Sequence, residues 1–217
     1  MNPLDTLIAR HVAPVAKAAG FTKKGRTFRL AGANGDHLLM HFDTHAVDPA
    51  RHVFDVTFWI VPLPYWEFLN RQYANPPAPE AGGALATCPV IPPPGVAHEP
   101  EEEMPFRSRW AFTEPGTRDL CGRELARVLA EETLPLVTRL LDRRTLLEQT
   151  RSNPNGELVR LRGAAQSEIV LRVDSDPLAE VTALVDKAET DGGFPPFVTW
   201  ARQRLRQRAE REGFAWP

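Results

Sequence analysis

Three stretches of alternating apolar and polar residues, at positions 27–31, 36–45 and 52–61, constrain the fold of this chain more than any other feature. Successive side chains of a β-strand point to opposite faces of a sheet, so this alternation predicts half-buried strands. Asn34-Gly35, a strong hairpin signal, separates the first two stretches, and a turn at residues 47–50 separates the last two. These short connections predict an antiparallel meander.

The alternation divides the side chains of the strands between an apolar face and a polar face. The apolar face is expected to line the core and carries Phe28, Leu30, Leu38, Met40, Phe42, Phe54, Val56, Phe58 and Ile60. The polar face carries Thr27, Arg29, His37, His41, Asp43, His45, Asp55, Thr57 and Trp59. A fourth strand is predicted at residues 106–113. It places Phe106, Trp110 and Phe112 on the apolar face, and Arg107 and Arg109 on the polar face.

Helices are predicted before and after this sheet. Residues 3–19 and 118–150 carry apolar residues at helical spacing, and a shorter helix is expected at residues 65–72. Pro14 and Pro135 lie inside the two long patterns, where a proline is expected to kink or break a helix.

The remaining segments have weaker patterns. Residues 75–105 hold nine prolines, a Gly-Gly pair and an acidic run, which favours an extended loop. Residues 168–173 are too few for their period to distinguish a strand from a helix. Residues 176–189 and 195–212 predict two further helices.

Together these patterns predict an α+β fold. An antiparallel sheet of four or five strands is expected to be covered on one face by helices, with a C-terminal helical extension. Residues 1–150 are expected to form the α+β core domain, with the proline-rich insertion at 75–105. Residues 151–217 are expected to form a mainly helical extension that packs on this core.

Composition narrows the classes of function. The chain has 217 residues and a net charge of −2, so its composition supplies no general attraction to nucleic acid or to anionic membranes. Two cysteines do not make a disulfide framework. No apolar run approaches the roughly 20 residues of a membrane span, and the first residues lack the pattern of a signal peptide. A cytoplasmic protein without membrane association is therefore expected.

Two short stretches carry a family resemblance. In GFTKKGRTFRL, residues 20–30, a helix end and a basic turn precede a strand with an inward Phe; the second stretch is LPLVTRLLDRRTLLEQ, residues 134–149. Both resemble an uncharacterised bacterial family, domain of unknown function 4304. The resemblance implies an α+β domain and, from gene neighbourhoods, toxin-immunity or accessory roles. The family supplies no catalytic residues, so none is carried over to this chain.

The polar face holds candidate metal ligands in His41, Asp43 and His45, with Asp55 on the neighbouring strand. Residues two apart on a strand are about 7 Å apart, so their side chains can converge on one ion. Imidazole and carboxylate ligands suit zinc, iron or manganese. Because no compact ligand motif is present, an ion-paired or solvent-exposed face is favoured over a divalent metal, and no cofactor is expected.

The same face is a candidate binding surface through Trp59, Thr57, Arg107 and Arg109. Exposed tryptophan and arginine side chains are typical of the residues that dominate binding energy at interfaces. The equally weighted alternative is that the proline-rich segment lies across the face and buries Trp59.

Three other features favour structural roles. The basic turn at residues 23–26 follows a helix end, where cations interact favourably with the helix dipole, so capping is favoured over phosphate binding. The arginines of the last helix are interleaved with Glu210 and Glu212, so nucleic-acid binding is not favoured. Cys88 and Cys121 lack a Cys–His signature and are expected to be inert.

The sequence therefore predicts a non-enzymatic protein-binding or immunity-like module that engages a protein partner through the polar sheet face. The alternative is a metal-dependent hydrolase that uses His41, Asp43, His45 and Asp55.

Overall fold

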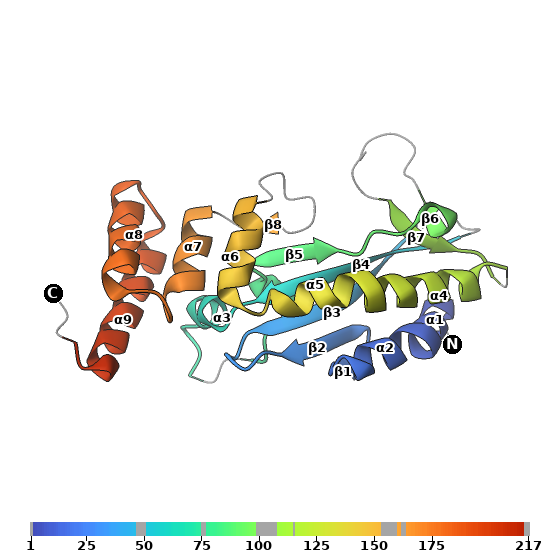
Figure 1. Ribbon diagram of the computed structural model, residues 1–217, viewed down its shortest axis with the longest axis horizontal. Helices are drawn as coiled ribbons and strands as arrows, with labels where there is room; N and C mark the ends of the chain where they lie inside the picture. The colour runs from blue at the N-terminus through green and yellow to red at the C-terminus, as the bar shows by residue number, and fades with distance from the viewer. Residues whose placement is uncertain are drawn as a thin grey trace.

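The computed structural model describes residues 2–46, 51–74, 77–98, 108–114, 116–152, 160–161 and 164–214. An antiparallel sheet runs through the centre of the molecule, and helices cover one of its faces and extend beyond one end (Figure 1). The predicted α+β fold, with helices on one face and a C-terminal helical extension, is confirmed.

The sheet is built around the predicted meander. Strands β2 (Thr27–Ala31), β3 (His37–His45) and β4 (His52–Val61) pair in sequence order, and Thr27 lies opposite His41, which lies opposite Thr57. The other strands are short, and most of them flank the meander. They are β1 (Thr22–Lys24) beside β2, β5 (Ala86–Pro89) and β7 (Arg109–Phe112) beside β4, β6 (Ala97–His98) beside β7, and β8 (Arg160–Leu161) beside β5.

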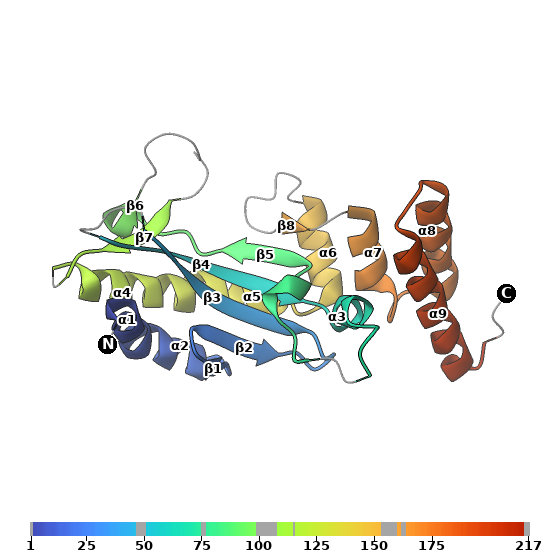
Figure 2. The same ribbon diagram turned by 180° about the vertical axis from the view of Figure 1, so that it is seen from behind.

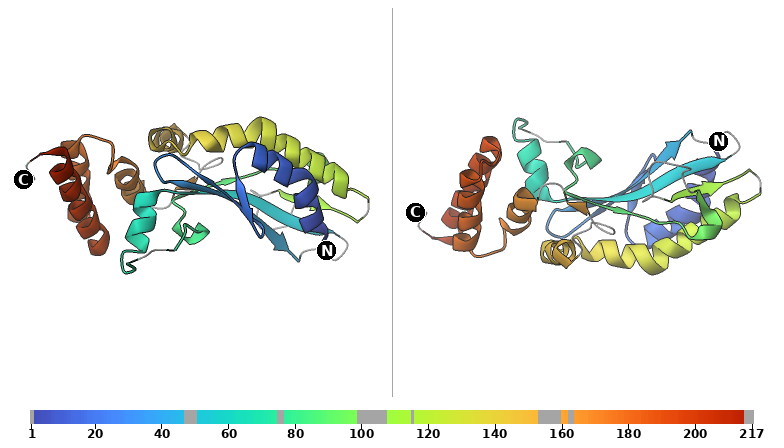
Figure 3. Two further views of the ribbon diagram at one scale, coloured as in Figure 1. Left: turned by 90° about the horizontal axis from the view of Figure 1, so that it is seen from below. Right: turned by 90° about the horizontal axis from the view of Figure 1, so that it is seen from above.

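Two long helical segments cover the apolar face of the sheet (Figure 3). The first comprises α1 (Pro3–Leu7), a π-helical turn (Ile8–Val12) and α2 (Ala13–Ala18). The second comprises α4 (Arg118–Val128), a π-helical turn (Leu129–Thr133) and α5 (Leu134–Arg139). Of the two outcomes expected at the prolines, a kink or a break, the break is wrong, because both segments continue as helix.

The π-helical turns explain how the helices tolerate Pro14 and Pro135. A proline ring clashes with the carbonyl four residues earlier, and the ring nitrogen cannot donate a hydrogen bond. In each segment the residue before the proline donates to the carbonyl five residues back: Ala13 to Ile8, and Leu134 to Leu129. The extra residue in the turn accommodates the proline without ending the helix.

The apolar face packs as predicted. Phe28, Leu38, Met40, Phe42, Phe54, Val56, Phe58 and Ile60 are all buried in one cluster with the covering helices. Trp110 of β7 is fully buried, and its indole N–H donates a 2.8 Å hydrogen bond to the carbonyl of Val90. Phe106 and Arg107, the first two residues of the predicted fourth strand, lie outside the described residues.

One end of the polar face is covered by a second, smaller apolar cluster. It comprises Leu39, Val61, Trp66 and Ala84, with Trp59 packed against it. Trp66 comes from α3 (Leu63–Leu69), and its indole N–H donates a 2.9 Å hydrogen bond to the carbonyl of Pro77. Gly83 lies so close to this indole that a Cβ would be 2.3 Å from it. The proline-rich segment therefore covers only part of the face and leaves Trp59 half-buried.

The prediction of an extended loop at residues 75–105 is only partly correct in its described part. Residues 77–80, 84–85 and 90–93 have no regular secondary structure, but the remaining residues up to 98 form β5, β6 and two 3₁₀ turns at Ala81–Gly83 and Pro94–Val96. Prolines lack a backbone donor but are tolerated at the ends of strands and on sheet edges. Pro89 is the last residue of β5, so it does not interrupt the pairing with β4.

Four helices extend the molecule away from the N-terminus (Figure 2). They are α6 (Arg143–Ser152), α7 (Ala164–Arg172), α8 (Leu178–Thr190) and α9 (Pro195–Glu212). Residues 168–172 are helical, which settles the choice between strand and helix. Helix α6 spans the predicted domain boundary at residue 150.

A network of buried charges connects this extension to the sheet. Arg143 of α6 donates two hydrogen bonds to Asp36, at 2.6 and 2.7 Å, and one of 2.8 Å to Asp174. Arg204 of α9 donates two more to Asp174 and also contacts Glu67 of α3. The network joins α6, α9 and the turn after α7 to Asp36, which directly precedes β3.

Candidate functional site

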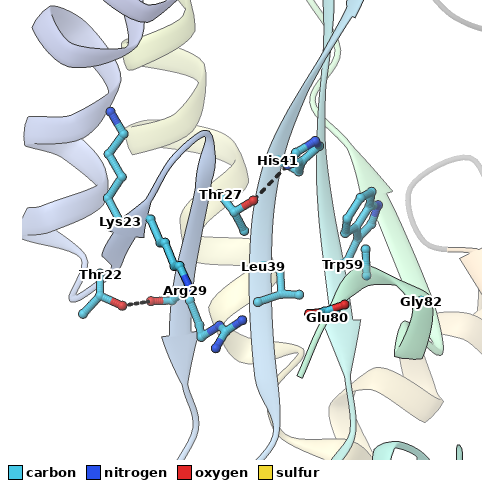
Figure 4. A pocket seen from close by; sticks show the side chains of 11 residues that line it. Thr22, Lys23, Thr27, Arg29, Leu39, His41, Trp59, Glu80 and Gly82 are labelled. Carbon is cyan, nitrogen blue, oxygen red and sulfur yellow. Dashed lines mark hydrogen bonds between the residues drawn. The ribbon is translucent and has the colours of Figure 1, made fainter. Parts of the chain in front are cut away.

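A hollow of about 600 Å³ lies on the polar face, where β1–β4 form its floor and residues 80–82 one wall (Figure 4). Two rows of cross-strand partners cross this floor. The first row is Lys24, Thr27, His41 and Thr57, and the second is Thr22, Arg29, Leu39 and Trp59. Cross-strand partners place their side chains on the same face, so each row presents its side chains side by side.

His41 is held in a fixed orientation at the centre of the first row. Its ring stacks on Trp59, with centroids 5.2 Å apart and an angle of 21° between the planes. Its Nδ1 lies 3.0 Å from Thr27 Oγ1, and its Nε2 lies 3.2 Å from Asp43 Oδ1. Both contacts are satisfied when Thr27 donates to Nδ1 and the protonated Nε2 donates to the carboxylate. The ring is thereby fixed against Trp59.

The side of the hollow near β1 and β2 carries positive charge. Lys24 is exposed on the edge strand, and Arg29 is half-buried with one guanidinium N–H donating 2.7 Å to the carbonyl of Pro79. Within the described ranges, no ion pair joins either cation to a carboxylate. Glu80 is the only carboxylate among the described residues that line the hollow.

The pKa of His37, on the same face, is affected by this positive charge. Burial lowers the pKa of His37, and the nearby positive charge of Arg29 lowers it further, which outweighs the opposing effect of Asp36. His37 is therefore neutral at pH 7 and adds no charge. The positive charge at this end of the face comes from the lysine and the arginine.

At the opposite end of the polar face, beyond Thr57, acidic side chains lie next to basic ones. Asp43 and Asp55 are cross-strand partners, and His45 Nε2 lies 2.8 Å from Asp55 Oδ2. The Nε of Arg109 lies 3.8 Å from the same oxygen. Asp55 therefore has two basic neighbours, whereas Asp43, with 51% of its side chain exposed, has only His41 among the described residues.

The four predicted metal ligands form two separate pairs in the structure. His41 contacts Asp43, and His45 contacts Asp55. Among the described residues, no group of three or more His, Cys, Asp or Glu side chains is arranged to hold a metal ion. A site that used all four residues would require both pairs to separate, and the metal site stays a prediction.

The predicted binding residues are divided along the face. Thr57 and Trp59 belong to the two rows of the hollow, Arg109 lies at the opposite end of the face, and Arg107 lies outside the described residues. The sequence reasoning missed Lys24 and Thr22 as residues of the site, because it did not predict β1. The signal was the two-residue Gly25-Arg26 turn, which pairs the lysines with the following strand.

Both cysteines are buried in the main apolar core, which lies on the other side of the sheet from the hollow. Burial raises the pKa of Cys88 and of Cys121 to about 12, so both thiols stay protonated at pH 7. Neither is available as a nucleophile, as expected from the sequence.

Comparison with known protein families, with curated proteins and with solved structures found no match to this chain. In the part of the chain that the structure describes, no helix has the length and apolar character to cross a membrane.

Proposed function

We propose that this chain is a non-enzymatic binding module that engages a protein partner in the cytoplasm through its polar sheet face. The observation that carries the proposal is the exposed hollow, in which the fixed His41–Trp59 stack lies beside Lys24 and Arg29, cations without a carboxylate partner among the described residues. Tryptophan and arginine are the residue types that most often dominate binding energy at protein interfaces.

The rigidity of the face supports binding. Its floor consists of paired strands, and His41 has a contact on each of its ring nitrogens. Groups that are already ordered lose little conformational entropy when a partner docks, so more of the contact energy contributes to affinity.

The same contacts argue against acid–base catalysis at His41. A general base needs a ring nitrogen that reaches the substrate. Here Nδ1 contacts Thr27 and Nε2 contacts Asp43, so the imidazole serves to orient the stack. The resemblance to a family with immunity-like gene neighbourhoods is consistent with a protein-binding role.

The test begins with affinity capture. The tagged protein is used to retain partners from an extract of its native cells, and a retained protein is identified, purified and titrated by calorimetry. Trp59→Ala combined with Arg109→Ala is expected to weaken this binding by about 30-fold or more, since hot-spot residues contribute about 2 kcal/mol or more.

Phe214→Ala combined with Arg206→Ala is the matched control. Both residues are exposed at the C-terminal end, and this variant is expected to bind like the wild type. Equal affinity of the wild type and the Trp59/Arg109 variant would refute the proposal.

Elemental analysis discriminates the proposal from a metal-dependent hydrolase. Stoichiometric metal in the purified protein, removed by a chelator together with hydrolytic activity, would replace the binding proposal. Metal retention that is lost in His45→Ala would assign the ion to the predicted site.

A further inference from the structure

We infer that the hollow receives an acidic side chain of the protein partner, a glutamate or aspartate held between Lys24 and Arg29. This inference rests on the proposed function and adds the chemistry of the partner to it. It depends on Lys24 and Arg29, two cations at the hollow that pair with no carboxylate of the described residues.

Four cations lie between residues 23 and 29, and two of them are directed elsewhere. The Nε of Arg26 donates 2.7 Å to the carboxylate of Asp5. The ammonium of Lys23 lies 5.5 Å from the centre of the Phe28 ring, and Figure 4 shows this side chain reaching away from Leu39. Lys23 also lines the hollow, but its ammonium lies over Phe28, so Lys24 and Arg29 remain to bind a ligand there.

Arg29 is positioned in advance for a carboxylate. One terminal nitrogen of its guanidinium donates 2.7 Å to the carbonyl of Pro79, which fixes the plane of the group, and it has no other hydrogen bond to the described residues. A guanidinium presents five N–H donors in a fixed fork that matches a carboxylate. The fixed plane lowers the entropy lost when such a pair forms.

The hydroxyl groups of Thr22 and Thr27, which line the hollow, already have hydrogen-bond partners within the chain. Thr22 Oγ1 donates 3.2 Å to the carbonyl of Arg29, and Thr27 Oγ1 contacts His41. The ligand is therefore selected mainly by charge. Leu39 and Trp59 supply an apolar floor, which suits the methylene groups of a glutamate.

The charge pattern of the whole face favours a protein over a nucleic acid or a free phosphate. The end near Lys24 is positive, whereas the exposed carboxylates of Asp43 and Glu80 are negative. A polyanion meets repulsion at both carboxylates, and a free phosphate uses only the positive end. A protein surface with charges of both signs matches the face, and like charges placed together disfavour other partners.

The experiment uses defined probes and the full chain. At low ionic strength the ¹⁵N-labelled protein is titrated with an acetylated and amidated hexapeptide in which glutamate alternates with lysine, so that the probe carries charges of both signs. We expect saturable shifts at the backbone amides of Thr22, Lys24 and Thr27 and at the Trp59 indole. Lys24→Glu is expected to weaken this binding at least tenfold. Arg29→Gln should do the same, and its spectrum reports whether the fold persists.

Lys17→Glu is the matched control, because Lys17 is exposed on α2 and this substitution changes the net charge by the same amount. It is expected to leave the affinity for this peptide within twofold. Absent shifts at the hollow, or equal weakening by both lysine substitutions, would overturn the inference. Equal affinity for hexathymidylate or for inorganic phosphate at the same residues would overturn its assignment to a protein carboxylate.

The partner identified by affinity capture separates this inference from the proposed function. If Trp59→Ala with Arg109→Ala weakens that complex and Lys24→Glu does not, the binding face stands and the acidic contact is wrong. If neither variant weakens the complex, both proposals are wrong. Weakening by both variants, with Lys17→Glu unchanged, supports both.

Discussion

Two groups of charged residues lie on this sheet and differ in how completely they are paired. In the network at the start of β3, Asp36 and Arg143 expose only 2% and 10% of their side chains, and each has several oppositely charged or polar contacts. In the hollow, Lys24 is exposed and Arg29 contacts a single carbonyl. Every charge of the first group has an oppositely charged partner, whereas Lys24 and Arg29 have none among the described residues.

The difference shows which charges stabilise the fold and which are available to a ligand. A buried ion that loses its partner is strongly destabilising, because it is neither hydrated nor paired. An exposed cation is hydrated and contributes little to stability. Substitutions in the two groups should therefore separate stability from binding.

The largest effect is expected for Asp36→Ala. This change removes both hydrogen bonds that Asp36 accepts from Arg143 and the one it accepts from the Leu63 amide, at 2.8 Å. We expect the free energy of unfolding to fall by about 3–5 kcal/mol in urea titrations. Asp43→Ala, a change of an exposed aspartate, should cost less than about 1 kcal/mol. Similar losses for the two variants would contradict the distinction.

A smaller loss is expected for Gly83→Ala, at the apolar cluster that borders the hollow. The new Cβ would meet the Trp66 ring at 2.3 Å, and such overpacking typically costs about 1–3 kcal/mol. Gly82→Ala is the matched control, because nothing lies within 4 Å of its Cβ position. In thermal unfolding, the melting temperature of Gly83→Ala should be lower than that of Gly82→Ala. An unchanged melting temperature in Gly83→Ala would show that the Trp66 ring can move to make room for the methyl group.

The paired network should also depend on pH. Burial raises the pKa of Asp174, but hydrogen bonds from Arg204 and Arg143 and their charges outweigh it, so the pKa is lowered overall. A carboxyl with a lowered pKa in the folded state stabilises the protein above its unfolded pKa of about 3.9. This stabilisation is lost as the pH falls through the folded value. The free energy of unfolding, measured by urea titration at each pH, should therefore fall less in Asp174→Asn than in the wild type as the pH is lowered from about 5.

The smallest effect on stability is expected for Lys24→Glu. Substitution of an exposed residue without an ion pair typically changes the free energy of unfolding by less than about 0.5 kcal/mol. The melting temperature should therefore match that of the wild type, while partner binding falls. A large loss of stability would show that Lys24 serves the fold.

The sequence predicts the meander and its two faces because strand alternation is a local pattern. The strands at residues 27–31 and 52–61 have the predicted bounds, and the described apolar residues of the first face are buried, except Leu30, which is partly buried. Leu39 and Val61 lie on the face predicted to be polar, and they are buried because α3 and residues 77–85 cover them. That cover depends on contacts between distant segments, which alternation does not encode.

The candidate site shows the same division. Thr57 and Trp59 follow from alternation alone, whereas the contribution of Lys24 depends on β1, a strand of only three residues. Asp36 has its main contact with Arg143, which is 107 residues away in the sequence. Such a pair is not visible in a local pattern, so the network that joins the extension to the sheet needed the structure.

Hydrogen–deuterium exchange on the complex with the captured partner shows directly whether the partner binds at the hollow. We expect slower exchange at the edge strand β1, at the Gly25-Arg26 turn and at residues 77–85, with α8 and α9 unchanged. Protection confined to α8 and α9, with β1 and residues 77–85 exchanging as in the free protein, would contradict it.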